Sequence, residues 1–543
     1  MKYCLGVLIV LGILGADSLH AQLPNWRWAR SGGGRARDQT SSLAVDSIGN
    51  VFVTGYYRDS AIFAGVDLNS SAGNHFFLAK YSPNSNLIWI RTSNLKGQSY
   101  GTGVCLSQGK YLCLTGYFSD SIAFDDHLLI SSGNNDIFLA KYDLDGSAIW
   151  AVKGGSPGLD QARSVSSDAF GRIYITGNFS GTALFGSKQV TSIGGDEIFI
   201  VQYDSNGSAI WAKRIGASGD DAGWGIAVGE SGNFAITGTF SDTVDFGGIK
   251  LISPGLSDIF IAKYSYDGNL FWAKQAHDTT SGIGESTAID VNDNVYVAGR
   301  FELPGFVPDC EGSGNIYIAK FDSEGHIVWQ KCAGSGGEES GDAIAIDSSG
   351  NIFVTGGFDF TFDFGAGPLT HSSFIDGYIV KFDPSGTAQW SDNIGGIGDD
   401  EGFAVSSDRS GNVFLGGYFS DTVNCGPFVL QSLRQTDMFI AKIGAKSSVH
   451  YPPNSTVAQQ VSIFPNPASS AVTIELPLNA NKNGVNVELA SVLGITIRKV
   501  FFPQSGNTNS SLTLQINDLS KGIYICRVRG DGWVESQKFV IGD

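Results

Sequence analysis

The chain has 543 residues, which is long for one ordinary domain but suits a large repeat domain followed by a small one. Its 35 Lys and Arg against 53 Asp and Glu give a net charge of −18, which argues against nucleic acid or an anionic membrane surface as a partner. The 72 glycines, 12% aromatic residues and 16% charged residues exclude a disordered chain and favour many short strands joined by glycine turns.

The first residues have the pattern of a secretory signal. Lys2 precedes an apolar run from Leu5 to Gly15, and Ala21 offers a cleavage site before Gln22. The run is too short to span a bilayer, and no later segment is long enough to be a membrane helix. We therefore predict a signal peptide over residues 1–21 and a secreted protein without a transmembrane segment.

A long internal repeat follows the signal, over residues 22–444. Tryptophans recur at intervals of 61, 61, 61, 61, 57 and 61 residues, at Trp28, Trp89, Trp150, Trp211, Trp272, Trp329 and Trp390. Each period holds four strand-like runs separated by turn residues, which is the pattern of one β-propeller blade. The first run of each period is rich in small residues, as a crowded innermost strand requires. The sequence therefore predicts an all-β fold, a seven-bladed β-propeller.

The ends of the repeat predict how the ring closes. A Phe-Ile-Ala-Lys-type run occurs seven times, but no tryptophan strand follows the last copy at Met438–Lys442. Trp28 precedes the first blade and has no partner upstream. We expect the segment Asn25–Ser31 to supply the outer strand of the last blade, because this closure removes the exposed sheet edges.

The period and its phrases, such as Asp258–Tyr264 and Asn351–Gly356, resemble the SBBP family of β-propeller repeats. The resemblance covers roughly Trp26 to Gly444. It implies a seven-bladed propeller and says little about a ligand.

After the repeat, the composition changes. Residues 445–460 contain Pro452-Pro453 and little periodic pattern, which predicts a linker. Residues 461–543 have six strand-like runs of their own, which predict a small antiparallel β-sandwich. The alternative for this stretch is an ordinary immunoglobulin-like module.

Three motifs of this C-terminal stretch resemble the C-terminal sorting (Por) domain of type IX secretion. They are Phe464-Pro465-Asn466-Pro467, the run Leu519–Tyr524 that contains Gly522, and Lys538–Ile541. Phe464 stands where the family often has tyrosine. The resemblance implies that the type IX secretion machinery exports the protein across the outer membrane of a Gram-negative bacterium. It also implies removal of the domain, with the remainder attached to the cell surface or released.

An acidic residue lies ten residues after several of the tryptophans, and we regard this column as the candidate binding site. Its members are Asp38, Asp160, Asp221, Glu339 and Asp400, with Glu285 as the expected counterpart in a blade with a longer loop, and the adjacent acids Asp220, Asp399 and Glu401 add to it. Carboxylates at a channel mouth would attract Ca²⁺ or a basic or polyhydroxylated ligand. The alternative, which we favour, is that each acid caps backbone N–H groups of its own glycine loop.

Cysteines and histidines supply no zinc pattern, since no CxxC or HExxH motif is present. Cys310 and Cys332 flank the third strand of one blade, which makes them a candidate disulfide pair. Cys105 and Cys113 are expected to lie opposite each other across a hairpin.

No motif for a catalytic nucleophile, a metal centre or a phosphate loop is present, so we assign no catalytic residue and no cofactor other than a possible Ca²⁺. We expect a secreted or surface-bound module that binds a glycan, a protein or a surface polymer. Two alternatives stay open: a hydrolase or lyase that uses an acidic channel mouth, and a purely structural surface repeat.

Overall fold

The computed structural model describes residues 24–93, 95–276, 281–301, 316–334, 337–372, 374–444, 462–464, 470–475, 485–491, 496–502, 511–530 and 533–541. It separates into two compact units, residues 1–446 and 447–543. The predicted signal peptide, residues 1–21, and the predicted linker, residues 445–460, lie outside the described residues. The secondary structure of the described residues consists of strands and turns, so the predicted all-β class is confirmed.

Most strands of the first unit's described residues fall into seven four-stranded antiparallel groups, which we call repeat sheets 1 to 7. The strands of each repeat sheet are named in order from the innermost to the outermost. Repeat sheet 1 consists of β2 (Gln39–Val45), β3 (Val51–Phe63), β4 (Val66–Tyr81) and β5 (Leu87–Thr92). Repeat sheet 2 consists of β6 (Ser99–Ser107), β7 (Tyr111–Phe118), β10 (Asp136–Asp143) and β11 (Ala148–Gly155). Repeat sheet 3 consists of β12 (Gln161–Ser167), β13 (Ile173–Phe179), β16 (Glu197–Tyr203) and β17 (Ala209–Ile215).

Repeat sheet 4 consists of β18 (Ala222–Val228), β19 (Phe234–Phe240), β22 (Asp258–Tyr264) and β23 (Leu270–Ala276). Repeat sheet 5 consists of β24 (Gly282–Ile289), β25 (Val295–Phe301), β26 (Ile316–Phe321) and β27 (Ile327–Ala333). Repeat sheet 6 consists of β28 (Ala343–Ile346), β29 (Ile352–Phe358), β32 (Asp376–Phe382) and β33 (Ala388–Ile397). Repeat sheet 7 consists of β34 (Asp400–Ser407), β35 (Val413–Cys425), β36 (Phe428–Gly444) and β1 (Asn25–Gly34).

Short hairpins follow the second strand of several repeat sheets. They are β8 (Ser121–Phe124) with β9 (His127–Ile130), β14 (Thr182–Phe185) with β15 (Lys188–Thr191), β20 (Thr243–Asp245) with β21 (Lys250–Ile252), and β30 (Phe362–Asp363) with β31 (Pro368–Leu369). The long strands β3 and β4, and likewise β35 and β36, form the same feature without a break. An outermost strand can pair with the hairpin of the next repeat sheet, as β11 does with β14 and β33 with β35.

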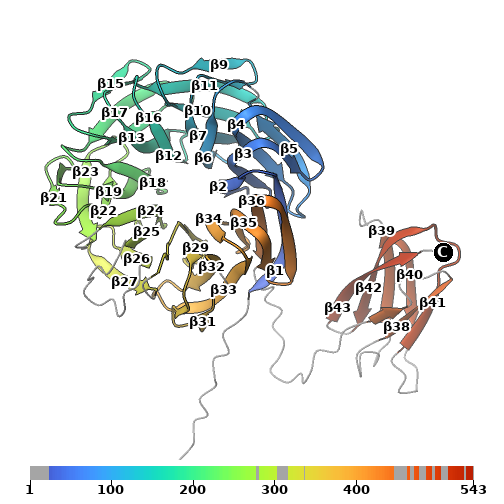
Figure 1. Ribbon diagram of the computed structural model, residues 1–543. Coiled ribbons are helices and arrows are strands. Elements are labelled where there is room, and N and C mark those ends of the chain that lie inside the picture. Colours follow the sequence, from blue (N-terminus) through green and yellow to red (C-terminus); the bar gives the residue numbers. More distant parts are fainter. Residues whose placement is uncertain are drawn as a thin grey trace, which may run out of the picture. The chain divides into compact units, whose positions relative to one another are not determined.

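The repeat sheets stand radially around a common centre, a propeller-like arrangement (Figure 1). The innermost strands contact one another in the order β2, β6, β12, β18, β24, β28, β34 and again β2. The N-terminal strand β1 pairs antiparallel with β36, with Trp28 opposite Lys442, as the sequence predicts. Its last residues, Gly32 to Gly34, pair with β3 of repeat sheet 1. The first strand of the chain therefore joins the last repeat sheet to the first.

Packing between repeat sheets explains the composition of the third strands. All seven positions of β16 and of β22 are buried, because both faces of these strands contact a neighbouring sheet. A strand that is buried on both faces shows a continuous apolar run instead of an alternating pattern. The lysine near the end of this run is buried as well, and its charge therefore needs a partner.

At the junctions of repeat sheets 1 and 2 and of 2 and 3, the repeated tryptophan and the repeated lysine bind the same backbone carbonyl of the next repeat sheet; elsewhere they can separate, since Trp272 binds the Ser323 carbonyl and Lys263 that of Asp293. Trp89 Nε1 donates to the Leu144 carbonyl at 3.2 Å, and Lys80 Nζ donates to that carbonyl at 2.8 Å. Trp150 and Lys141 bind the Ser205 carbonyl in the same way, at 3.2 and 2.9 Å. This carbonyl belongs to the tight turn before the next outermost strand. We call this arrangement the tryptophan latch.

Glycine in the receiving turn makes room for the indole ring at several junctions, while Ser85 takes this position at the Trp28 junction with φ +69°. Gly207 has φ +84°, and a Cβ at this position would lie 3.0 Å from Trp150. Gly146 meets Trp89 in the same way, with φ +87° and a Cβ distance of 2.9 Å. A side chain here would meet both a strained backbone and the indole ring. The Asp-x-x-Gly turn and the tryptophan of the preceding repeat are therefore parts of one contact.

The second unit contains two sheets in its described residues. One is formed by β37 (Ser462–Phe464), β38 (Ala471–Glu475) and β41 (Ser511–Gln515). The other is formed by β40 (Thr496–Phe502), β39 (Val485–Ser491), β42 (Gly522–Gly530) and β43 (Trp533–Ile541). Both sheets contribute to one apolar core, which includes Ile474 and Val487. In the part of the chain that the structure describes, no helix is long and apolar enough to cross a membrane.

Replacement of Trp28 tests the contact that joins repeat sheet 7 to repeat sheet 1. Trp28 Nε1 donates to the Pro83 carbonyl at 3.1 Å, and the side chain is 7% exposed. We expect Trp28→Phe to lower the free energy of unfolding by about 1–2 kcal/mol, since a partly buried carbonyl loses its donor. We expect Trp28→Ala to cost about 3–5 kcal/mol. Thermal denaturation measures both, with Arg30→Ala on the exposed face of β1 as the control. Unchanged stability in Trp28→Ala would contradict this closure.

Candidate functional site

The predicted acidic column is buried and holds its own loops. Asp160 Oδ2 accepts from the Ser156 amide at 2.6 Å and from the Ser156 hydroxyl at 2.9 Å. Asp221 accepts from the amides of Ala217 and Ser241, at 3.2 and 2.9 Å. Asp38, Asp160, Asp221, Glu339 and Asp400 are each at most 1% exposed. The contacts of Asp160 and Asp221 are those of the loop-capping alternative.

Glu285 does not belong to this column. Gly282 pairs with Phe301 as Asp400 pairs with Phe419, and the Gly282 amide donates to the Ser257 carbonyl at the corresponding position. Gly282 is therefore the counterpart of the acids, and the loop before it is not longer than the others. The prediction for Glu285 was wrong because Gly282, ten residues after Trp272, takes the position of the acid and carries no carboxyl.

Glu285 lies instead in a second column, three residues further on. At this position six of the innermost strands have a register shift, as between Gly284 and Ser286 in β24, whereas β28 begins one residue after it, at Ala343. A residue in such a bulge is left unpaired, and its side chain can be turned away from the sheet. The other residues three positions after the acidic column are Ser41, Thr102, Arg163, Trp224, Asp342 and Phe403. We call this set the bulge column.

Three side chains of the bulge column, from different repeat sheets, act on one another: Arg163 acts on the charge of Glu285, and Glu285 acts on that of Asp342. Arg300 of β25 and Glu401 of β34, which lie outside the column, also act on the charge of Glu285. Arg300 Nη1 lies 3.5 Å from Glu285 Oε1. These residues are partly exposed although the strands around them are buried, as expected of side chains that face the common centre. The register shifts therefore create a polar site at the centre of the repeat sheets.

A carboxyl pair lies beside Glu285. The Ser340 hydroxyl lies 2.8 Å from Asp342 Oδ2 and 3.2 Å from Glu401 Oε1, and the Tyr418 hydroxyl donates to Glu401 Oε2 at 3.0 Å. The Ser340 hydroxyl has one proton and donates to only one of the two carboxyls at a time. Burial and the charge of Glu401 raise the pKa of Asp342 well above its usual value. Asp342 and Glu401 therefore resist being ionised together.

Burial also raises the pKa of Glu285 to about 7, while Arg300 and Arg163 lower it and Glu401 raises it further. Three carboxyls and two guanidinium groups therefore act on one another at this site, and Arg300 offsets part of the charge of Glu285.

Aromatic side chains from neighbouring repeat sheets extend the polar site. The rings of Tyr100 and Tyr117 stack with centroids 4.7 Å apart, and Tyr56 meets Tyr100 edge to face at 5.1 Å. The Arg163 guanidinium lies 4.3 Å from the Trp224 ring, and Phe403 stacks on Tyr418 at 5.6 Å. We call the polar group and these rings together the inner cluster: Tyr56, Tyr100, Tyr117, Arg163, Trp224, Glu285, Arg300, Ser340, Asp342, Glu401, Phe403 and Tyr418.

The other predicted site residues are partly described. Cys332 is disulfide-bonded, whereas its predicted partner Cys310 lies outside the described residues. Cys105 and Cys113 are free thiols and lie directly opposite each other, in register. Within the described ranges, no group of three or more His, Cys, Asp or Glu has the geometry of a metal site.

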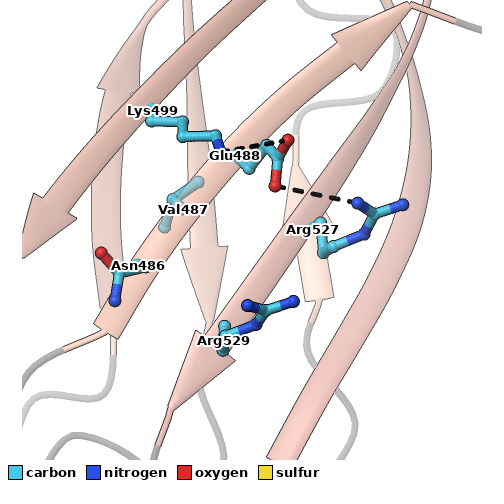
Figure 2. A pocket seen from close by; sticks show the side chains of 6 residues that line it. All are labelled: Asn486, Val487, Glu488, Lys499, Arg527 and Arg529. Atoms are coloured by element: carbon cyan, nitrogen blue, oxygen red, sulfur yellow. Dashed lines mark ion pairs between the residues drawn. The ribbon is translucent and has the colours of Figure 1, made fainter. Parts of the chain in front are cut away.

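In the second unit, the Tyr524 hydroxyl donates to the Ser520 carbonyl at 2.7 Å, Gly522 begins β42, and Lys538 pairs with Ile525. The motif residues Pro465, Asn466 and Pro467 lie outside the described residues. A shallow pocket lies on the four-stranded sheet of this unit (Figure 2). Glu488 lies in it between Lys499 and Arg527, at 3.9 and 3.7 Å, and Arg529 follows on the same strand as Arg527.

Sequence reasoning named Glu285 and Glu401 but missed Asp342, Arg163 and Arg300. A signal was available for two of these, since Asp342 and Arg163 lie three residues after the acids Glu339 and Asp160. Arg300 lies on a second strand and reaches the site only through strand pairing, opposite Ile283.

Comparisons with known proteins identify the second unit. Residues 462–542 match the protein family described as the secretion system C-terminal sorting domain. This match supports export to the cell surface or secretion.

Curated relatives match parts of the chain. An uncharacterized WD repeat-containing protein of Acanthamoeba polyphaga mimivirus is 23% identical over 441 residues, 64% of this chain and 32% of that protein. The regulatory protein FlaEY of Caulobacter vibrioides is 27% identical over 136 residues, 24% of this chain and 13% of that protein. The chain thus spans about a third or less of the length of these relatives.

Solved structures resemble the chain only distantly. Sqt1 from Chaetomium thermophilum is 9% identical, with a TM-score of 0.38, over 77% of this chain and 98% of Sqt1. PorZ, a surface component of the type IX secretion system of Porphyromonas gingivalis, is 11% identical, with a TM-score of 0.25, over 93% of this chain and 81% of PorZ.

The buried carboxyls predict how stability depends on pH. Burial raises the pKa of Glu285 to about 7 and those of Asp160 and Asp221 to about 6. Because these values lie above those of the unfolded chain, the unfolded state loses its protons first as the pH rises. The stabilisation is complete below the unfolded-state pKa and is lost as the pH rises through 6 and 7. We therefore expect a lower Tm at pH 8 than at pH 5, measured in a chelator. A Tm that rises over this interval would contradict these shifts.

Proposed function

We propose that this protein is an exported glycan-binding module that binds a neutral oligosaccharide or polysaccharide at its inner cluster. In this proposal residues 22–444 form a closed seven-bladed β-propeller of the SBBP type. The circular order of contacts between the innermost strands and the pairing of β1 with β36 support it. A ring of radially arranged sheets places one residue from each bulge around a single centre.

The chemistry of the inner cluster favours a neutral sugar. Sugars present hydroxyl groups, which need hydrogen-bond donors and acceptors, and C–H faces, which pack against aromatic rings. The inner cluster offers carboxyls, guanidinium groups and hydroxyls beside the rings of Tyr100, Tyr117 and Trp224. The single observation that carries the proposal is that the ion pair of Glu285 and Arg300, 3.5 Å apart, belongs to the same cluster as the stacked rings of Tyr100 and Tyr117.

A glycan array probed with the full chain tests this function. We expect binding to a neutral glycan, and we expect Tyr100→Ala to weaken it by about 10-fold, since one stacking contact is worth about 1–1.5 kcal/mol. Glu401→Gln should weaken it as well, because the Tyr418 hydroxyl and the Ser340 hydroxyl lose a charged partner. Phe170→Ala serves as the control, since Phe170 is an exposed aromatic residue (72%) in a turn outside the cluster. A chain that binds no glycan, or that binds equally well in all variants, would leave the purely structural role.

Glycoside hydrolysis is a second candidate for the same site. The pKa of Glu285, about 7, would allow this carboxyl to donate a proton near neutral pH. Glu401, within reach of its charge, would then be the second carboxyl. Release of reducing ends from a bound glycan, abolished by Glu285→Gln, would assign this activity. Binding without release would exclude it.

Export through the sorting domain has its own test. We propose that the type IX secretion machinery recognises the unit that contains residues 462–542 and carries the protein to the outer-membrane surface of a Gram-negative bacterium or beyond. We expect a chain that ends at residue 446 to remain in the periplasm. Cell fractionation of a producing strain measures this, with the full chain as the control. Surface exposure of the shortened chain would contradict the assignment.

A further inference from the structure

Pairs of buried acids lie at junctions between consecutive repeat sheets. The residue that begins the buried part of a third strand approaches the acid at the start of the next innermost strand. The described pairs are Asp437 with Asp38, Asp136 with Asp160, Glu197 with Asp221, and Asp376 with Asp400. All eight side chains are at most 3% exposed. Two like charges in a buried position need compensation by a cation or a proton.

Three of the four pairs have a basic side chain nearby. Lys153 Nζ lies 3.3 Å from Asp136 Oδ2, and Arg214 Nη1 lies 2.8 Å from Glu197 Oε2. His371 lies close enough to Asp376 to lower its pKa. The remaining pair, Asp38 with Asp437, lies at the junction where β1 joins β36.

At this closing junction, the strand position of Lys153 and Arg214 is neutral; it is also neutral at the Asp376–Asp400 junction, where Asn393 takes it and His371 is the basic neighbour. Lys153 lies opposite Phe138, two residues after Asp136, and Ser31 lies opposite Phe439, two residues after Asp437. Ser31 thus takes the place of Lys153. The charges that act most strongly on Asp38 are those of Asp437 and Asp59, both acidic. Two carboxyls are therefore buried here without the cation that the equivalent junctions have.

The two carboxyls approach each other over Gly33 and occupy the place that a side chain would take there. A Cβ added to Gly33 would lie 2.5 Å from Asp437 Oδ1 and 2.8 Å from Asp38 Oδ2. Asp437 Oδ1 is buried and has no hydrogen-bond partner within the protein. Asp38 accepts backbone N–H groups from Gly34 and Arg58, at 2.6 and 3.0 Å, and these donors favour its ionised form. Burial outweighs these donors and raises the pKa of Asp38 to about 8, so a cation that binds beside Asp38 and the unpartnered Asp437 oxygen displaces a proton.

We propose that a hard divalent cation, Ca²⁺ in an extracellular medium, binds between Asp38 and Asp437. Such a cation takes oxygen ligands, and the two carboxylates supply two of them together with the balancing charge. At this junction the cation balances the charge of the buried carboxylates, as Lys153 and Arg214 do at two of the other junctions. Because Asp38 follows β1 and Asp437 begins the buried part of β36, the ion fastens the N-terminal strand to repeat sheet 7. This site is separate from the inner cluster and does not depend on the proposed glycan binding.

Thermal denaturation of the full chain at pH 8 tests the site, in a chelator and in Ca²⁺ raised to about 10 mM, above the ~10⁻⁴–10⁻³ M range of extracellular calcium sites. We expect Ca²⁺ to raise the Tm of the native chain and to leave that of Asp437→Asn unchanged. Asp136→Asn is the matched control, because its junction has Lys153, and it should keep the full Ca²⁺ response.

Ser31→Lys separates a cation site from a general effect of calcium on the acidic surface. The new ammonium group would stand where Lys153 stands at the equivalent junction, so we expect a higher Tm in the chelator and no response to Ca²⁺. Equal Tm values of the native chain with Ca²⁺ and with the chelator would overturn the proposal. So would a Ca²⁺ response that survives in Asp437→Asn. Stabilisation of the native chain by acid alone, without a Ca²⁺ response, would assign a shared proton instead and would overturn it as well.

Discussion

The tryptophan latch is the contact on which the arrangement of the repeat sheets depends. A backbone carbonyl in a tight turn receives the indole N–H of the preceding repeat, and at two junctions it also receives the lysine ammonium, as Leu144 does from Trp89 and Lys80. The indole belongs to the outermost strand, so the latch holds the outer edge of one sheet against the next. Glycine in the turn leaves space for the indole ring, as Gly207 does for Trp150, although Ser85 takes this position at the Trp28 junction. Tryptophan and turn glycine therefore recur with one period because they meet in one contact.

Repetition of this contact has a consequence for function. If each sheet is held in the same orientation, the same position of every innermost strand lies at the same depth around the centre. The bulge column then brings together side chains that are far apart in the sequence, such as Arg163 and Glu285. The framework can stay constant while these few positions change. The inner cluster is therefore the part of the proposed propeller in which a ligand preference can be encoded.

The sequence alone was sufficient for the strand order, because a periodic contact leaves a periodic signal. The tryptophan spacing predicted the four-stranded repeats, and the missing strand after Lys442 predicted that β1 pairs with β36. The site was harder to predict. Glu285 was assigned to the wrong column because Gly282, its neighbour in the sequence, carries no side chain by which the column could be recognised. Arg300 could not be placed beside Glu285, since their approach depends on the register of β24 and β25.

The central claim is that the inner cluster, and not the outer hairpins or the rim, receives the ligand. A crystal structure of the full chain with a glycan that it binds tests this claim most directly. The account predicts a sugar ring against the faces of Tyr100 and Tyr117, with its hydroxyls bonded to Glu401 and Arg300. A sugar bound at the hairpins β8–β9 or β14–β15, with the inner cluster occupied by water alone, would contradict it.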